Sequence, residues 1–132
     1  SNTNAITIVT TYFGRGENNY EKSTIKNIPI QKWINVIIRA QNRTIDIYIN
    51  GVLTRRHNLG DVIKQNYGDI FVGDDKNGMD GFISSLRYFD HAIGNMKIQE
   101  IIQQGPNLKA IDVNKETMPP YLATRWYLDS IE

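Results

Sequence analysis

The feature that most constrains the fold of this chain is residues 33–50, WINVIIRAQNRTIDIYIN, in which Asn42-Arg43 separates two runs of alternating apolar residues. Side chains of a strand point to alternate faces, so the isoleucines of the second run share one face and match the apolar face of the first. A two-residue loop at Asn42-Arg43 places these apolar residues, including Ile38 opposite Ile47, opposite one another as core, and Arg39 opposite Asp46 on the other face. The stretch therefore predicts an antiparallel β-hairpin.

Short segments rich in β-branched and aromatic residues predict further strands on both sides of the hairpin. They are residues 5–13, 23–28, 52–57, 69–73, 81–90 and 121–128. Asn50-Gly51 is typical of a type I′ turn, because both residues of that turn need a positive φ. It predicts that residues 52–57 fold back on the hairpin as a third strand.

One helix is predicted in the C-terminal half of the chain. Ile98, Ile101 and Ile102 form an apolar stripe, Asn95 is placed to cap it, and Gly105-Pro106 is a usual stop. About eight short strands, tight turns and one brief helix together predict an all-β fold, namely an antiparallel jelly-roll β-sandwich.

Composition limits the function classes. The 132 residues suit one domain, and 15 basic against 14 acidic residues give a net charge of +1, which argues against nucleic acid as a partner. Without cysteine, the chain has no disulfides, thiol catalysis or cysteine-ligated metals. No apolar run approaches the roughly 20 residues that cross a bilayer, so no membrane span is expected in this segment.

The order of these features resembles the laminin G-like branch of the concanavalin A-like lectin and glucanase superfamily. KWINVIIRAQNRTIDIYINGVL, DIFVGDD and GFISSLRYFDHAIGNMKIQEIIQQGP carry the resemblance. The segments IPIQKW and PPYLATRWY are similar to laminin G-like proteins of large DNA viruses, where such domains are associated with virion structure or surface. The resemblance implies one laminin G-like domain over residues 1–132. The family pattern also has strands before the equivalent of Ala5, so this domain is expected to lack N-terminal strands.

The resemblance introduces an enzyme as one candidate function, because glucanases share this fold. Glucanases of this fold place acidic residues at alternate positions of one strand, where two carboxylates flank the scissile bond. Residues 44–50 offer only Asp46, which is expected to pair with Arg39. His57 and His91 have no partner at zinc-ligand spacing. The sequence therefore predicts a non-catalytic protein and no catalytic residue.

The loop Asp74–Asp80 is the candidate metal site. Carboxylates and loop carbonyls suit calcium, and the resemblance implies calcium at the rim of the sandwich, with Asp74, Asp75 and Asp80 as ligands. The alternative is a solvated turn in which Asp and Asn side chains bond their own backbone.

The outward face of the hairpin is the candidate ligand site. A lectin-like site needs an aromatic platform, which Trp33 and Tyr48 could supply, and polar groups for sugar hydroxyls, which Arg39, Asp46 and Asn50 could supply. The same face also carries Ile37 and Leu53. It is therefore either covered by another part of the domain or available to another protein.

These observations predict a non-catalytic, lectin-like recognition or assembly module. The resemblance implies a structural, surface or capsid-associated protein of a large DNA virus that contacts neighbouring proteins or glycans. The alternatives are a glycan-binding lectin or adhesion domain of a secreted or cell-surface protein, and a glucanase-type glycosidase. The expected location is the virion or the extracellular surface.

Overall fold

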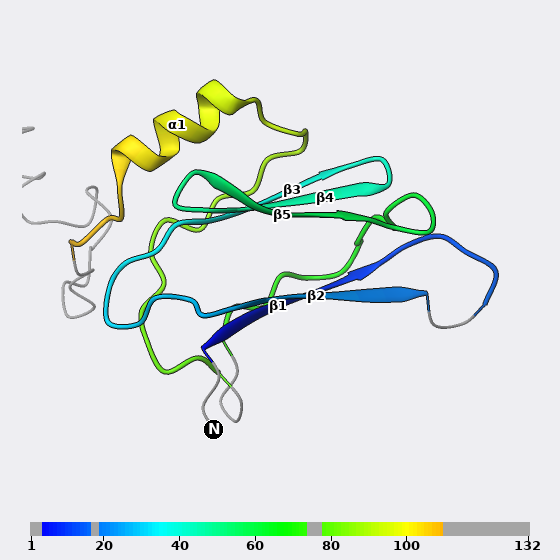
Figure 1. The fold of residues 1–132 in the computed structure, drawn as a ribbon, viewed down its shortest axis with the longest axis horizontal. Helices are drawn as coiled ribbons and strands as arrows, with labels where there is room; N and C mark the ends of the chain where they lie inside the picture. Colours follow the sequence, from blue (N-terminus) through cyan, green and yellow to red (C-terminus); the bar gives the residue numbers. More distant parts are fainter. Residues whose placement is uncertain (1–3, 17–18, 74–77, 110–132) are drawn as a thin grey trace, which may run out of the picture.

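The computed structural model describes residues 4–16, 19–73 and 78–109. Within these residues, two antiparallel sheets and one helix form three layers, with the three-stranded sheet in the middle (Figure 1). The elements are β1 (Ala5–Thr11), β2 (Tyr20–Lys26), β3 (Val36–Gln41), β4 (Thr44–Ile49), β5 (Val52–Asn58) and α1 (Asn95–Gln104). The sheets are β1-β2 and β3-β4-β5, so the predicted β-sandwich class is confirmed.

The central hairpin has the predicted register. Its pairs include Ala40 with Ile45, Ile38 with Ile47 and Val36 with Ile49, and Arg39 faces Asp46. The turn that follows is also as predicted, because Asn50 and Gly51 both have positive φ, 50° and 81°. The register between β4 and β5 shifts by a bulge at Ile47/Tyr48, which the sequence did not indicate.

The main core lies between the two sheets. Ile45 and Ile47 of β4 pack with Ile25 of β2 and with Leu59, and Ile47 is completely buried. On β3, in contrast, Ile38 is 52% exposed, although its face was predicted to be core. This prediction was wrong because β3 is an edge strand, and the apolar side chains of the two-stranded sheet pack against the central strand β4 instead.

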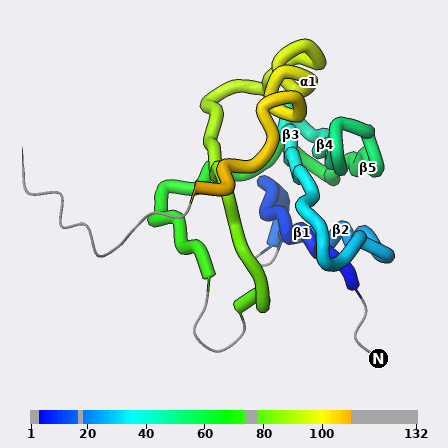
Figure 2. Tube along the Cα trace, turned by 90° about the vertical axis from the view of Figure 1, so that its left-hand side faces the viewer, coloured from blue at the N-terminus to red at the C-terminus, as the bar shows by residue number. Residues whose placement is uncertain are grey.

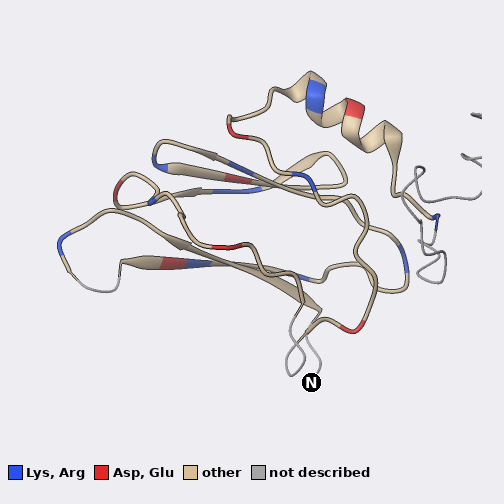
Figure 3. Cartoon of the chain, turned by 180° about the vertical axis from the view of Figure 1, so that it is seen from behind, with Lys and Arg blue, Asp and Glu red and all other residues tan. Residues whose placement is uncertain are grey.

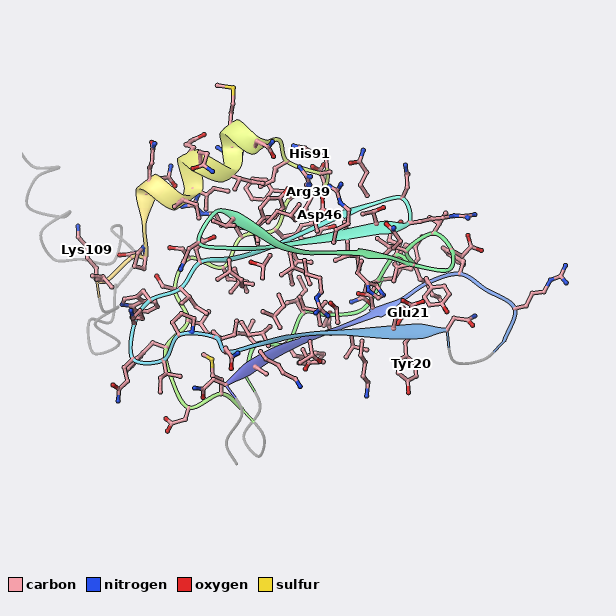
Figure 4. All side chains as sticks on the ribbon, viewed as in Figure 1. Tyr20, Glu21, Arg39, Asp46, His91 and Lys109 are labelled. Atoms are coloured by element: carbon pink, nitrogen blue, oxygen red, sulfur yellow. The ribbon has the colours of Figure 1, made fainter. Side chains whose placement is uncertain are left out.

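Polar groups and backbone also join the two sheets. His57 of β5 contacts Glu21 of β2, whose side chain is labelled in Figure 4. Residues 59–64 bridge the sheets, since the Phe13 N–H donates to the Val62 carbonyl at 2.8 Å and the Leu59 N–H to the Arg43 carbonyl at 2.7 Å. Basic and acidic residues are interspersed over both sheets (Figure 3).

A second core lies between the middle sheet and α1. Ile98 of the helix, which is 1% exposed, packs with Tyr48 and Ile93, so the helix covers the outward face of the hairpin. The helix ends at Gln104 with Gly105 as its C-cap, so the predicted stop is confirmed. Its N-cap is Gly94 rather than Asn95, because the extended backbone of Gly94 precedes the first helical residue and no side chain caps the helix.

The predicted strands at residues 69–73 and 81–90 are not strands in this structure. A strand needs a neighbour for its backbone hydrogen bonds, and within the described residues these two segments pair with none. Residues 78–92 run from the level of the β1-β2 sheet to the level of α1 (Figure 2).

The predicted strand at residues 121–128 lies outside the described residues. Nowhere in the described part of the chain is a helix long and apolar enough to cross a membrane.

Candidate ligand-binding cleft

A cleft of about 370 Å³ lies between the outer face of the β3-β4-β5 sheet and helix α1. Small-ligand sites usually have volumes of about 300–1,000 Å³, so the cleft is large enough for one sugar ring. It is formed by the sheet on one side and by the first two turns of α1 on the other. Its lining residues are Arg39, Tyr48, Gly51, Leu53, Arg56, Asn95, Ile98 and Gln99.

Two arginines and one carboxylate form the polar base of the cleft. Asp46 Oδ2 accepts hydrogen bonds from Arg39 Nη2 at 2.7 Å and from Arg56 Nη2 at 2.9 Å, and Asp46 Oδ1 accepts one from Arg56 Nε at 2.6 Å. Figure 4 shows Arg39 and Asp46 on the side of the sheet that faces the helix. The three charged side chains thus come from three adjacent strands, β3, β4 and β5.

The arginines keep Asp46 ionised. Asp46 is 4% exposed, and burial alone would raise its pKa. The hydrogen bond from Arg56, the largest effect, and the bond and charge of Arg39 outweigh burial and lower the pKa from 3.8 to about 2. At neutral pH the group therefore has two positive charges and one negative charge.

Arg39 is fixed from several sides. Its guanidinium lies over the Tyr48 ring, 5.3 Å from the ring centroid, and its Nη1 donates to the Ile93 carbonyl at 3.3 Å. Arg56 is more open to solvent, because its side chain is 54% exposed. Arg39 is therefore held rigidly at the base of the cleft, and Arg56 carries the charge that a ligand can reach.

The structure brings together some of the predicted ligand-binding residues. Arg39 and Tyr48 line the cleft and Asp46 lies at its base. Asn50 instead closes the hairpin, since its Oδ1 accepts a hydrogen bond from the Asn35 N–H at 2.9 Å. Trp33 is 45% exposed and does not line the cleft.

Sequence reasoning missed Arg56, Leu53, Asn95 and Gln99. In a regular β4-β5 ladder, Asp46 would face Arg55, whereas the bulge at Ile47/Tyr48 brings Arg56 opposite Asp46. The spacing of Asn95 and Gln99 was an available signal, because residues four apart share a helix face.

Of the predicted calcium ligands, Asp74 and Asp75 lie outside the described residues, and Asp80 is exposed. Within the residues that the structure describes, no group of three His, Asp or Glu side chains is placed to hold a metal ion. The calcium site stays a prediction.

A laminin G-type family model, described as the concanavalin A-like lectin/glucanases superfamily, matches residues 2–99. The chain belongs to this superfamily. Comparison with curated proteins and with solved structures gives no match. Membership of the concanavalin A-like superfamily supports a lectin-like or binding module in general. Laminin G-like domains are generally non-catalytic, although the superfamily also includes glycosidases.

Proposed function

We propose that this laminin G-like domain is a non-catalytic recognition module that binds a glycan in the cleft between α1 and the β3-β4-β5 sheet. The observation that carries the proposal is the fixed group of Arg39, Asp46 and Arg56 beside Tyr48. Its hydrogen bonds are made within the domain, so little side-chain entropy is lost when a ligand arrives. Leu53 and Ile98 add apolar wall against which a sugar ring can pack.

The state of Asp46 supports a role without catalysis. A general acid or base works best when its pKa is near the working pH, and retaining glycosidases need two such carboxyl groups about 5–5.5 Å apart. Asp46 has a pKa of about 2 and both of its oxygens accept hydrogen bonds from arginine. It therefore contributes structure and charge to the cleft rather than proton transfer.

A glycan array with the purified domain tests this proposal. Asn95→Trp places an indole at the mouth of the cleft, and we expect it to abolish any array binding. Met96→Trp is the matched control, because Met96 is 90% exposed on the same helix and does not line the cleft. Circular dichroism checks that both variants fold. Binding that survives Asn95→Trp, or an array without any binding, contradicts the proposal.

A second candidate function, assembly with neighbouring proteins, is favoured by a different surface. Residues 67–73 and 78–88, the described part of the segment Tyr67–Tyr88, expose many large apolar side chains: Tyr67, Ile70, Phe71, Val72, Met79, Phe82, Ile83, Leu86 and Tyr88. Exposed apolar groups on this scale usually mark a protein contact. Together with the resemblance to laminin G-like proteins of large DNA viruses, this favours a surface or capsid-associated protein of a virion. One domain can serve both functions, because the cleft and this apolar segment consist of different residues.

A further inference from the structure

The polar groups of the cleft also indicate the charge of its ligand. We infer that the cleft takes a carboxylate group, carried by a sugar acid rather than by a neutral sugar. This inference rests on the proposed glycan-binding function and narrows it to one chemical class.

The balance between hydrogen-bond donors and acceptors in the cleft favours a ligand that accepts. Sugar hydroxyls donate as well as accept hydrogen bonds, so a site for a neutral sugar needs acceptors as well as donors. Guanidinium groups only donate. Arg39 and Arg56 supply the charged groups among the lining residues, and none of these residues is an aspartate or a glutamate. The side chains of Asn95, Gln99 and Tyr48 can both donate and accept, so the two guanidinium groups make the cleft richer in donors, which suits a ligand that mainly accepts.

Asp46 does not restore this balance. Its Oδ1 accepts one hydrogen bond and its Oδ2 accepts two, all from arginine, and its side chain is only 6% exposed. A sugar hydroxyl therefore competes with two guanidinium groups for this carboxylate. One negative charge against two positive charges also leaves a net charge of +1 at the base of the cleft.

The geometry of Arg56 suits binding of a second carboxylate. It binds Asp46 through Nε and Nη2, and its Nη1 forms no hydrogen bond to any described residue. A guanidinium can bind a second carboxylate through its other edge, with two parallel N–H···O bonds. The exposure of the Arg56 side chain leaves this edge accessible. Arg39 has a further unsatisfied donor, because its buried Nε–H has no hydrogen-bond acceptor within the described residues.

Titration of the full ¹⁵N-labelled chain with four small probes at pH 7 tests the inference. The probes are glucuronate, its methyl ester, glucose and acetate, and the readout is the chemical shift of the cleft amides and of the Arg56 Nε–H. We expect glucuronate to bind at least about tenfold more tightly than its ester or glucose, and acetate to shift the same signals. High salt should weaken glucuronate binding, because charge attraction is screened.

Charge variants locate the effect. Arg56→Gln should weaken glucuronate binding by about tenfold or more, and Arg56→Lys should retain part of it because the charge stays while the second edge is lost. Arg55→Gln is the matched control. This substitution removes the same charge from the same strand, and Arg55 does not line the cleft. The comparison of acid with ester uses the unaltered protein, so it remains decisive even if Arg56→Gln does not fold.

The outcomes separate this inference from the proposed function. Equal binding of glucose and glucuronate in the cleft overturns the inference and leaves the proposed glycan binding intact. Shifts with acetate but with neither sugar support a carboxylate site and overturn its assignment to a sugar acid. Equal losses in Arg55→Gln and Arg56→Gln overturn the inference, because they indicate attraction to net charge alone. Absence of binding by all four probes contradicts both proposals.

Discussion

Asp46 is a buried carboxylate to which Arg39 of β3 and Arg56 of β5 both donate hydrogen bonds. Its pKa falls from 3.8 to about 2 on folding, so the folded domain binds this proton more weakly than the unfolded chain. The resulting stabilisation is complete above about pH 4 and is lost as the pH falls to about 2. A shift of this size corresponds to about 2 kcal/mol.

Urea denaturation between pH 2 and pH 5 measures this contribution. We expect the free energy of unfolding of the unaltered protein to fall as the pH is lowered from 5 to 2, and that of Asp46→Asn to vary less. Asp46→Asn should already be less stable at pH 7, because it leaves two guanidinium groups without their carboxylate. Asp61→Asn, which removes a carboxylate from an exposed pair with Arg43, is the control and should keep the fall. An unchanged pH dependence in Asp46→Asn would show that the Asp46 ion pairs do not set acid stability.

Gly51 is a single residue on which both a turn and a packing contact depend. Its φ is 81°, and an added Cβ would lie 3.2 Å from Ile102 Cγ1 and 3.4 Å from Gln99 Nε2. We expect Gly51→Ala to lower the free energy of unfolding by roughly 1–2 kcal/mol, mainly through the left-handed backbone. Gly94→Ala is the control, because nothing lies within 4 Å of its Cβ position. Equal denaturation midpoints for the two variants would contradict this account.

At the scale of elements, the sequence predicts what depends on neighbouring residues and fails where a distant partner decides. The β3-β4 register was predictable because a two-residue loop fixes it and a slip of one residue would expose the isoleucines. The β4-β5 bulge has no such signal, and Arg56 was missed for that reason. The segments 69–73 and 81–90 have the composition of strands, but composition does not provide the neighbouring strand that their backbone needs.

Helix α1 is an element whose stability should come from the sheet beneath it. It has ten residues and no side-chain cap, and isolated helices of that length are marginal in water. Ile98 is its buried contact with Tyr48 and Ile93, so Ile98→Ala should cost about 2–5 kcal/mol. Amide hydrogen exchange over residues 95–104 should accelerate more than exchange in β4. Met96→Ala, at an exposed position of the same helix, should change neither the free energy of unfolding nor the exchange rates. Equal effects of Met96→Ala and Ile98→Ala would show that docking on the sheet does not stabilise the helix.

At the scale of the whole molecule, the apolar segment Tyr67–Tyr88 predicts self-association. Phe82 and Tyr88 are 86% and 81% exposed, and a net charge of +1 provides little repulsion between copies. Sedimentation velocity over a range of concentrations should show a rising mean mass, and the double variant Phe82→Ser and Tyr88→Ser should reduce it. Met96→Ser, at an exposed apolar position on α1, should not reduce it. A monomer at every concentration would mean that this surface does not bind a second copy. The assembly proposal would then require a different protein as the partner, whereas ligand binding in the cleft would be unaffected because the cleft shares no residue with this segment.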